Sequence, residues 1–137
     1  MSIFNIFEKK KDKVRNIDTD RILDDTINDL KRNPDACTLT GGMKMKDETT
    51  AIYESNPGRQ LSEFIKFFYD SDLVDKNYES NVAVLKNKDT DSCTYNEICS
   101  ILTSIIRGDR FQSGLIYSKF KDWTLLMLLE KLKELSK

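Results

Sequence analysis

The chain has 137 residues and a formal net charge of −1, and 33% of its residues are charged. This length fits one domain that buries a core without metal or disulfide support. The balanced charge gives no broad basic surface, so neither nucleic acid nor a membrane is an expected partner. The chain contains no histidine, which excludes Ser-His and Cys-His nucleophile pairs and HExxH zinc sites built from its own residues.

The three cysteines, Cys37, Cys93 and Cys99, form an odd set without a C-x-x-C pair. No apolar N-terminal segment resembles a signal peptide or a membrane span. We therefore expect a cytoplasmic protein with reduced thiols, without a bound metal or other cofactor.

Residues 1–16 combine an apolar cluster, which includes Phe4 and Phe7, with a basic run that ends at Lys13. We interpret them as an arm that packs on its own core or on a sister subunit, followed by a linker. The alternative is an amphipathic anchor that docks on a membrane or a partner. A single helical domain is expected over residues 17–137.

Apolar residues at helical spacing predict a first helix over residues 18–33, which Asn33 and Pro34 end. Residues 37–53 surround the pair Gly41 and Gly42 and predict a short β-hairpin. A turn is expected at residues 55–58. A second helix follows, with one apolar stripe formed by Leu61, Phe64, Ile65 and Phe68.

The run NVAVL at residues 81–85 predicts a short strand or an extended buried segment. Thr94 and Glu97 form a T-x-x-E capping box that begins a third helix. The last helix is expected from about Asp122, with a stripe of leucines along one side. Together these patterns predict a mostly α protein, a compact small helical bundle with a short β-hairpin.

Arg107 and Arg110 lie in a corner between Gly108 and Gly114, and helical projection places neither arginine on the core face. One interpretation is structural: the arginines contact the last carbonyls of the third helix and pair with Asp109, Asp122 or Glu97. The other is a binding site in which two guanidinium groups hold a phosphate or carboxylate.

The last helix carries a second apolar patch, because Trp123 and Met127 stand at i and i+4 opposite its leucine stripe, with Leu126 beside them. Such a patch indicates a second contact, with another subunit, a partner protein or a ligand. The alternative is a helix buried on two sides within its own domain.

The C-terminal part of the chain, YNEICSILTSIIRGDRF followed by GLI and a closing LLEKLKEL, resembles the bacterial and phage family of unknown function 6508. The resemblance covers about residues 36–137, and Arg107, Arg110, Phe111 and Gly114 match the family element. The chain departs from the family pattern at Gln112, where a small Cys-like residue is usual, and at Trp123, where Gly is usual. If relatives leave a pocket open there, the resemblance implies that Trp123 could fill it.

From these residues and this resemblance, the leading hypothesis is a non-enzymatic protein that binds a small anionic, nucleotide-like ligand. A phage or mobile-element protein that sequesters a host signalling nucleotide, an anti-defence role, fits the distribution of the family. The expected ligand-binding residues are Arg107, Arg110, Phe111, Arg59 and Trp123.

The alternative function is a protein-interaction module or inhibitor that uses the Trp123 and Met127 face. A homo-oligomer is also expected, with an interface formed by Trp123, Leu126, Met127, Phe4 and Phe7. A carboxylate-based hydrolase is disfavoured, because the two D-T-D sequences at residues 18–20 and 89–91 have no supporting ligands on one predicted face.

Overall fold

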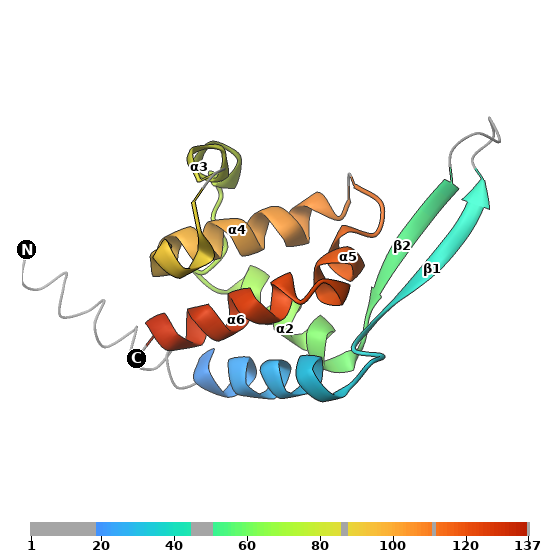
Figure 1. Cartoon of the computed structure of the whole chain (residues 1–137), viewed down its shortest axis with the longest axis horizontal. Helices are drawn as coiled ribbons and strands as arrows, with labels where there is room; N and C mark the ends of the chain where they lie inside the picture. The colour runs from blue at the N-terminus through green and yellow to red at the C-terminus, as the bar shows by residue number, and fades with distance from the viewer. Residues whose placement is uncertain (1–18, 45–50, 86–87, 111, 137) are drawn as a thin grey trace, which may run out of the picture.

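The computed structural model describes residues 19–44, 51–85, 88–110 and 112–136. These residues form a helical body with a two-stranded antiparallel hairpin projecting from it (Figure 1). The predicted fold class, a mostly α bundle with a short β-hairpin, is confirmed. None of the described helices is long and apolar enough to cross a membrane.

The described part of the first helix covers residues 19–32 and lies antiparallel beside α6 (Thr124–Leu135). Ion pairs join the two helices, one between Lys31 and Glu130 and one between Lys133 and Asp24. The helices α4 (Tyr95–Gly108) and α2 (Arg59–Asp70) complete the body (Figure 1). Its buried side chains include Leu23, Leu30, Leu61, Phe64, Phe68, Ile98, Leu102, Leu125, Leu128, Leu129 and Leu132.

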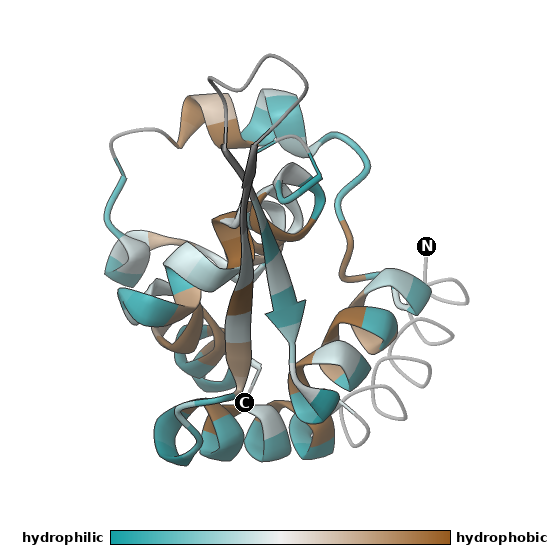
Figure 2. Ribbon diagram, turned by 90° about the vertical axis from the view of Figure 1, so that its right-hand side faces the viewer, coloured by the Kyte–Doolittle hydropathy of each residue, from teal (hydrophilic) through white to brown (hydrophobic). Residues whose placement is uncertain are grey.

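The apolar sides of the first helix, α2 and α4 all face this core, since removing apolar area from water is the main stabilising contribution. The capping box of α4 is confirmed. Thr94 Oγ1 accepts a hydrogen bond from the Glu97 N–H at 3.2 Å, and Glu97 Oε1 accepts one from the Thr94 N–H at 2.8 Å. Figure 2 shows how hydrophilic and hydrophobic residues alternate around the helices.

The predicted hairpin is confirmed, with strands β1 (Cys37–Lys44) and β2 (Ala51–Pro57). Leu39 pairs with Ser55 and Gly41 with Tyr53, and the register shifts between Gly41 and Met43. The predicted turn at residues 55–58 was wrong in extent, because β2 continues to Pro57 and only Gly58 separates it from α2. Side chains alternate across a strand, so Leu39, Tyr53 and Ser55 share one face of the hairpin.

The prediction of a strand or an extended buried segment at residues 81–85 is wrong. Residues 81–84 belong to a helix, α3 (Tyr78–Val84), in which no residue is buried. Short apolar runs do not distinguish strand from helix by periodicity. Here Asp75 stabilises the start of the helix. Its carboxylate accepts hydrogen bonds from the Asn77 N–H at 2.9 Å and from Asn81 Nδ2 at 2.7 Å.

The chain between α4 and α6 contains a helix that the sequence did not predict, α5 (Leu115–Lys121). A sharp bend at Trp123 separates it from α6, so the last helix begins at Thr124. Trp123 has a backbone φ of 69°, in the left-handed region that bulky side chains rarely adopt. The result is an elbow, α5–Trp123–α6, in which α5 packs against the hairpin.

Candidate functional site

A serine of the corner after α4 fastens the hairpin to the helical body. Ser113 Oγ accepts a hydrogen bond from the Tyr53 N–H at 2.6 Å and donates one to the Tyr53 carbonyl oxygen. One hydroxyl group therefore satisfies both backbone groups that Tyr53 presents at the outer edge of β2. This contact joins residues that are 60 positions apart in the sequence.

A second contact involves Ser55, which follows Tyr53 by two residues in β2. The buried Ser55 donates a hydrogen bond from Oγ to Asp109 Oδ1 at 2.8 Å and accepts one from the Tyr117 N–H at 3.0 Å. Asp109 Oδ1 also accepts from the Ile116 N–H at 2.9 Å. Asp109 and Ser55 therefore bind the first turn of α5, where backbone N–H groups lack helical partners.

Gly114 permits the close approach of α5 to the hairpin. Its φ of 70° favours glycine, and a Cβ at this position would lie 3.0 Å from Cδ1 of Leu39. The glycine singled out in the sequence is thus required by backbone conformation and by packing. This requirement explains its place in the corner without any ligand.

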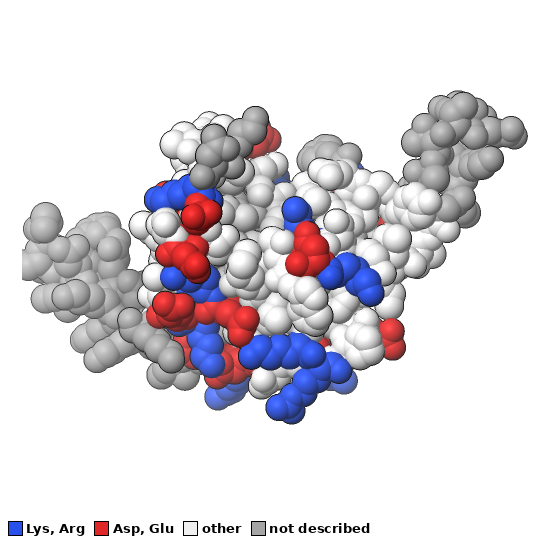
Figure 3. Space-filling model, in the orientation of Figure 1, with Lys and Arg blue, Asp and Glu red and all other residues white. Residues whose placement is uncertain are grey.

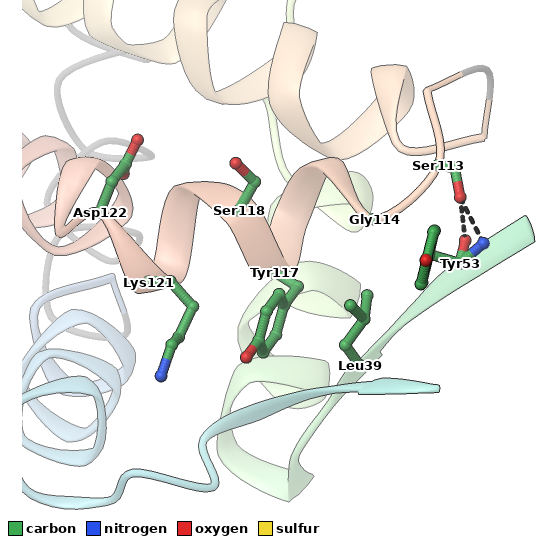
Figure 4. Close-up of a pocket in the computed structure, with 8 residues that line it drawn as sticks. All are labelled: Leu39, Tyr53, Ser113, Gly114, Tyr117, Ser118, Lys121 and Asp122. Carbon is green, nitrogen blue, oxygen red and sulfur yellow. Dashed lines mark hydrogen bonds between the residues drawn. The ribbon is translucent and has the colours of Figure 1, made fainter. Parts of the chain in front are cut away.

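The space between the hairpin and α5 is an open groove of about 570 Å³, which we call the aromatic groove. In Figure 4, Tyr117 and Lys121 project from one side of α5, and Leu39 extends from β1 toward α5. The lining is mostly apolar, and the Lys121 ammonium lies 5.9 Å from the centre of the Tyr117 ring. The lining residues are Leu39, Tyr53, Ser113, Gly114, Tyr117, Ser118, Lys121 and Asp122.

A smaller groove of about 190 Å³, which we call the Trp123 groove, lies between the elbow and the end of the first helix. Lys121 lines both grooves, so the two are adjacent. The residues that line the smaller groove are Leu30, Lys31, Arg32, Asn33, Pro34, Phe120, Lys121 and Trp123.

Comparison with known proteins gives a family but no activity. The model of a family of unknown function, DUF6508, matches residues 15–137. The chain belongs to this family. The match begins upstream of the expected boundary near residue 36 and so includes the first helix. No curated protein and no solved structure matches the chain.

The arginines predicted to bind an anion are exposed in this DUF6508 protein. The Arg107 guanidinium lies 5.7 Å from the ring centre of Tyr78 in α3, a distance typical of a cation–π contact. Arg59 pairs along α2 with Glu63, its Nε lying 3.6 Å from Oε1. Among the described residues, neither Arg107 nor Arg110 forms an ion pair.

The prediction that Arg107 and Arg110 pair with nearby carboxylates is therefore wrong. The predicted partners were Asp109, Asp122 and Glu97. Asp109 binds Ser55 and the start of α5, and Glu97 pairs with Lys88 at 2.8 Å. Asp122 instead accepts a hydrogen bond from the Thr124 N–H at 2.9 Å. Asp109 and Asp122 thus bind backbone N–H groups, and Glu97 binds Lys88 in place of an arginine.

The second apolar patch of the last helix is confirmed as exposed. Trp123 is 57% exposed and Met127 45% exposed, and Leu126 packs partly against the core. Trp123 therefore lines a groove and does not fill a closed pocket. The other predicted site residues, Phe111 of the ligand site and Phe4 and Phe7 of the interface, lie outside the described residues.

All three cysteines are buried free thiols. Burial raises the pKa of Cys37 to about 11, with a further contribution from the negative charge of Asp109. Burial also raises the pKa of Cys99 to about 12, assisted by Asp75. Neutral buried thiols are poor nucleophiles, and the described residues contain no group of three acidic or cysteine side chains placed to hold a metal ion.

The residues that attach the hairpin to α5 are not evident from the sequence. The predicted turn includes Ser55, Asp109 is predicted only as a partner for the arginines, and Ser113 and Tyr117 have no predicted role. The alternation of Cys37 and Leu39 with Thr38 and Thr40 is the available signal, because it marks one face of the first strand as covered.

Proposed function

We propose that this DUF6508 protein is a non-enzymatic interaction module that binds a segment of another protein along the aromatic groove. The observation that carries the proposal is where the exposed large apolar side chains lie. Leu39 is 40% and Tyr53 43% exposed in the aromatic groove, and Trp123 lines the groove next to it. Met127 follows one helical turn after Trp123.

Exposed large apolar side chains that lie beside grooves favour a protein partner. Exposed apolar side chains scattered singly need no explanation, whereas a contiguous group beside a groove is typical of interaction sites. Tyrosine and tryptophan add a large contact area with few rotatable bonds, so they are enriched at the centres of protein interfaces. The aromatic groove is open to solvent, which suits a segment of a partner protein better than an enclosed small molecule.

Selection from a display library of random peptides tests the proposal. We expect the full chain to enrich peptides that a variant with Leu39→Ser and Tyr53→Ser binds about tenfold less tightly, because aromatic anchors carry a large share of interface energy. Val84→Ser is the matched control, since Val84 is 84% exposed and lies outside both grooves. Failure to enrich any peptide, or an equal loss in the control, would contradict the proposal.

A second candidate is the binding of a small anionic, nucleotide-like ligand, including the sequestration of a signalling nucleotide. The exposure of Arg107 and Arg110, neither of which has an ion-pair partner within the described residues, favours it. Calorimetric titration of nucleotides against the wild type and an Arg107→Ala, Arg110→Ala variant tests this candidate. Loss of about tenfold in affinity is the expected result for a clasped anion.

A further inference from the structure

The Trp123 groove has an apolar base and a cationic rim. Leu30 and Phe120, both buried, lie at its base. Three cations, Lys31, Arg32 and Lys121, contribute to its lining, and no carboxylate does. On the face drawn in Figure 3, positive and negative side chains interleave on the left of the view. An all-cationic lining is therefore a local departure from a nearly neutral protein.

The cations of this groove are only partly neutralised. Lys31 pairs with Glu130, its Nζ lying 3.1 Å from Oε2. Lys121 lies over the Tyr117 ring, and within the described chain Arg32 takes part in no ion pair. Positive charge remains in excess around an exposed indole ring, an arrangement that attracts an acidic partner with apolar side chains.

The size of the groove decides between ligand classes. Small-molecule sites usually enclose about 300–1,000 Å³. The Trp123 groove encloses about 190 Å³, which accommodates a side chain or two and not a whole nucleotide. The N-terminal segment of this chain is an unsuitable occupant, because its basic run of Lys9, Lys10, Lys11 and Lys13 carries the same charge as the rim.

We infer that the partner segment is acidic and that the cations of the Trp123 groove select it by its negative charge. This inference rests on the proposed function. An apolar side chain of the segment lies on Trp123 and Phe120, and neighbouring carboxylates pair with Arg32 and Lys121. Lys121 lines both grooves, so the segment continues from the Trp123 groove into the aromatic groove. The aromatic groove supplies contact area, and the cationic rim supplies selectivity.

The composition of the selected peptides tests the inference separately from the proposed function. We expect peptides enriched by the wild type to combine Asp or Glu with apolar residues. A variant with Arg32→Glu and Lys121→Glu should bind them roughly tenfold less tightly, because charge-assisted contacts become repulsive. The double variant Lys66→Glu, Lys76→Glu is the matched control, with an equal change in net charge at exposed positions outside both grooves.

Fluorescence gives a direct second measurement, because Trp123 is the only tryptophan in the chain. Addition of a synthetic peptide of alternating glutamate and leucine should shift Trp123 emission to shorter wavelength. The shift should weaken as added salt shortens the screening length from about 10 Å at 0.1 M to about 3 Å at 1 M. The peptide with lysine in place of glutamate should leave the emission unchanged.

Each other outcome overturns the inference. Peptides enriched without an acidic bias, or bound equally by the charge-reversed variant, would refute it while the proposed function stands. Enrichment of no peptide at all would remove both. A Trp123 emission shift with ATP or pyrophosphate, without one from the acidic peptide, would replace the acidic segment by a small anion.

Discussion

Trp123 has a backbone conformation that is strained for a residue with a Cβ atom. A φ of 69° places Cβ close to the neighbouring carbonyl oxygen, which costs about 1–2 kcal/mol for residues other than glycine. Glycine, which the family resemblance implies at this position, adopts a left-handed conformation without strain. The strain is thus stored beside an exposed indole ring that lines a groove, a location typical of functional strain.

We predict that Trp123→Gly is more stable than Trp123→Ala by about 1 kcal/mol, the reverse of the usual order, because only glycine relieves the left-handed strain. Urea unfolding of both variants measures the difference. Lys66→Gly and Lys66→Ala in α2 form the control pair, where alanine should be the more stable by about 1 kcal/mol. The same order at both positions would contradict the prediction.

The buried thiols should be unreactive until the protein unfolds. The raised pKa values of Cys37 and Cys99, about 11 and about 12, keep both thiols protonated at pH 8, and only the thiolate attacks an alkylating reagent. Mass spectrometry after brief iodoacetamide treatment should show little labelling in buffer and full labelling in urea. Rapid labelling of the folded chain would show that the thiols are accessible.

The same thiols predict how stability changes with pH. Their pKa in the folded state lies above the ordinary value of 9.0, so the unfolded chain loses these protons first as the pH rises. The unfolding free energy should therefore decrease above about pH 9. A Cys37→Ala, Cys99→Ala variant should show a smaller decrease over the same range, and an identical decrease would count against the thiols.

At the scale of elements, two serines decide how the hairpin is held. Ser55 is buried and its hydroxyl joins Asp109 to α5, whereas Ser113 makes its contacts with Tyr53 at an exposed position. Removing a buried partner leaves polar groups unsatisfied, which costs more than removing an exposed one. The attachment of the hairpin, and with it the shape of the aromatic groove, should depend mainly on Ser55.

We predict that Ser55→Ala costs about 1–3 kcal/mol of unfolding free energy and Ser113→Ala about 1 kcal/mol. Thr38→Ala, on the opposite and exposed face of the hairpin, should stay within about 0.5 kcal/mol. Hydrogen exchange at the Tyr53 amide should accelerate in Ser113→Ala, because its acceptor is gone. Unchanged exchange there would show that another group holds this strand edge.

For the molecule as a whole, we predict that neither metal nor disulfides contribute to stability. The described cysteines are unpaired thiols that lie in the apolar core. Chelator and reductant should leave the melting temperature nearly unchanged. A decrease beyond about 5 °C, roughly 1 kcal/mol for a domain of this size, would reveal a covalent or metal link.

Self-association remains a prediction that the same exposed surface motivates. Trp123 and Met127 are uncovered in a single chain, and a two-fold dimer would bury them. Light scattering at high concentration should then give more than the mass of one chain. The mass of a single chain, with Trp123 emission typical of water, would contradict the dimer and leave this surface to a different partner.

The helices whose signals are local could be predicted from the sequence alone. The first helix, α2 and α4 follow from apolar residues at helical spacing, and the capping box of Thr94 and Glu97 marks the start of α4 within one residue. The absence of histidine likewise excludes whole classes of catalytic site without any structure. These signals act within one or two turns of the chain, so periodicity and caps suffice to detect them.

The helices α3 and α5 and the two grooves depend instead on contacts between elements that are distant in the sequence. Asp75 binds Asn81 of α3, and it is itself held by hydrogen bonds with Ser100 and Thr103 of α4. The helix α5 forms where Ser55 and Asp109 accept its backbone N–H groups. The aromatic groove brings together Leu39 and Tyr117, which are distant in the sequence. Hydrogen bonds and surfaces of this kind depend on which elements meet in space, a property that local hydrophobic periodicity does not carry.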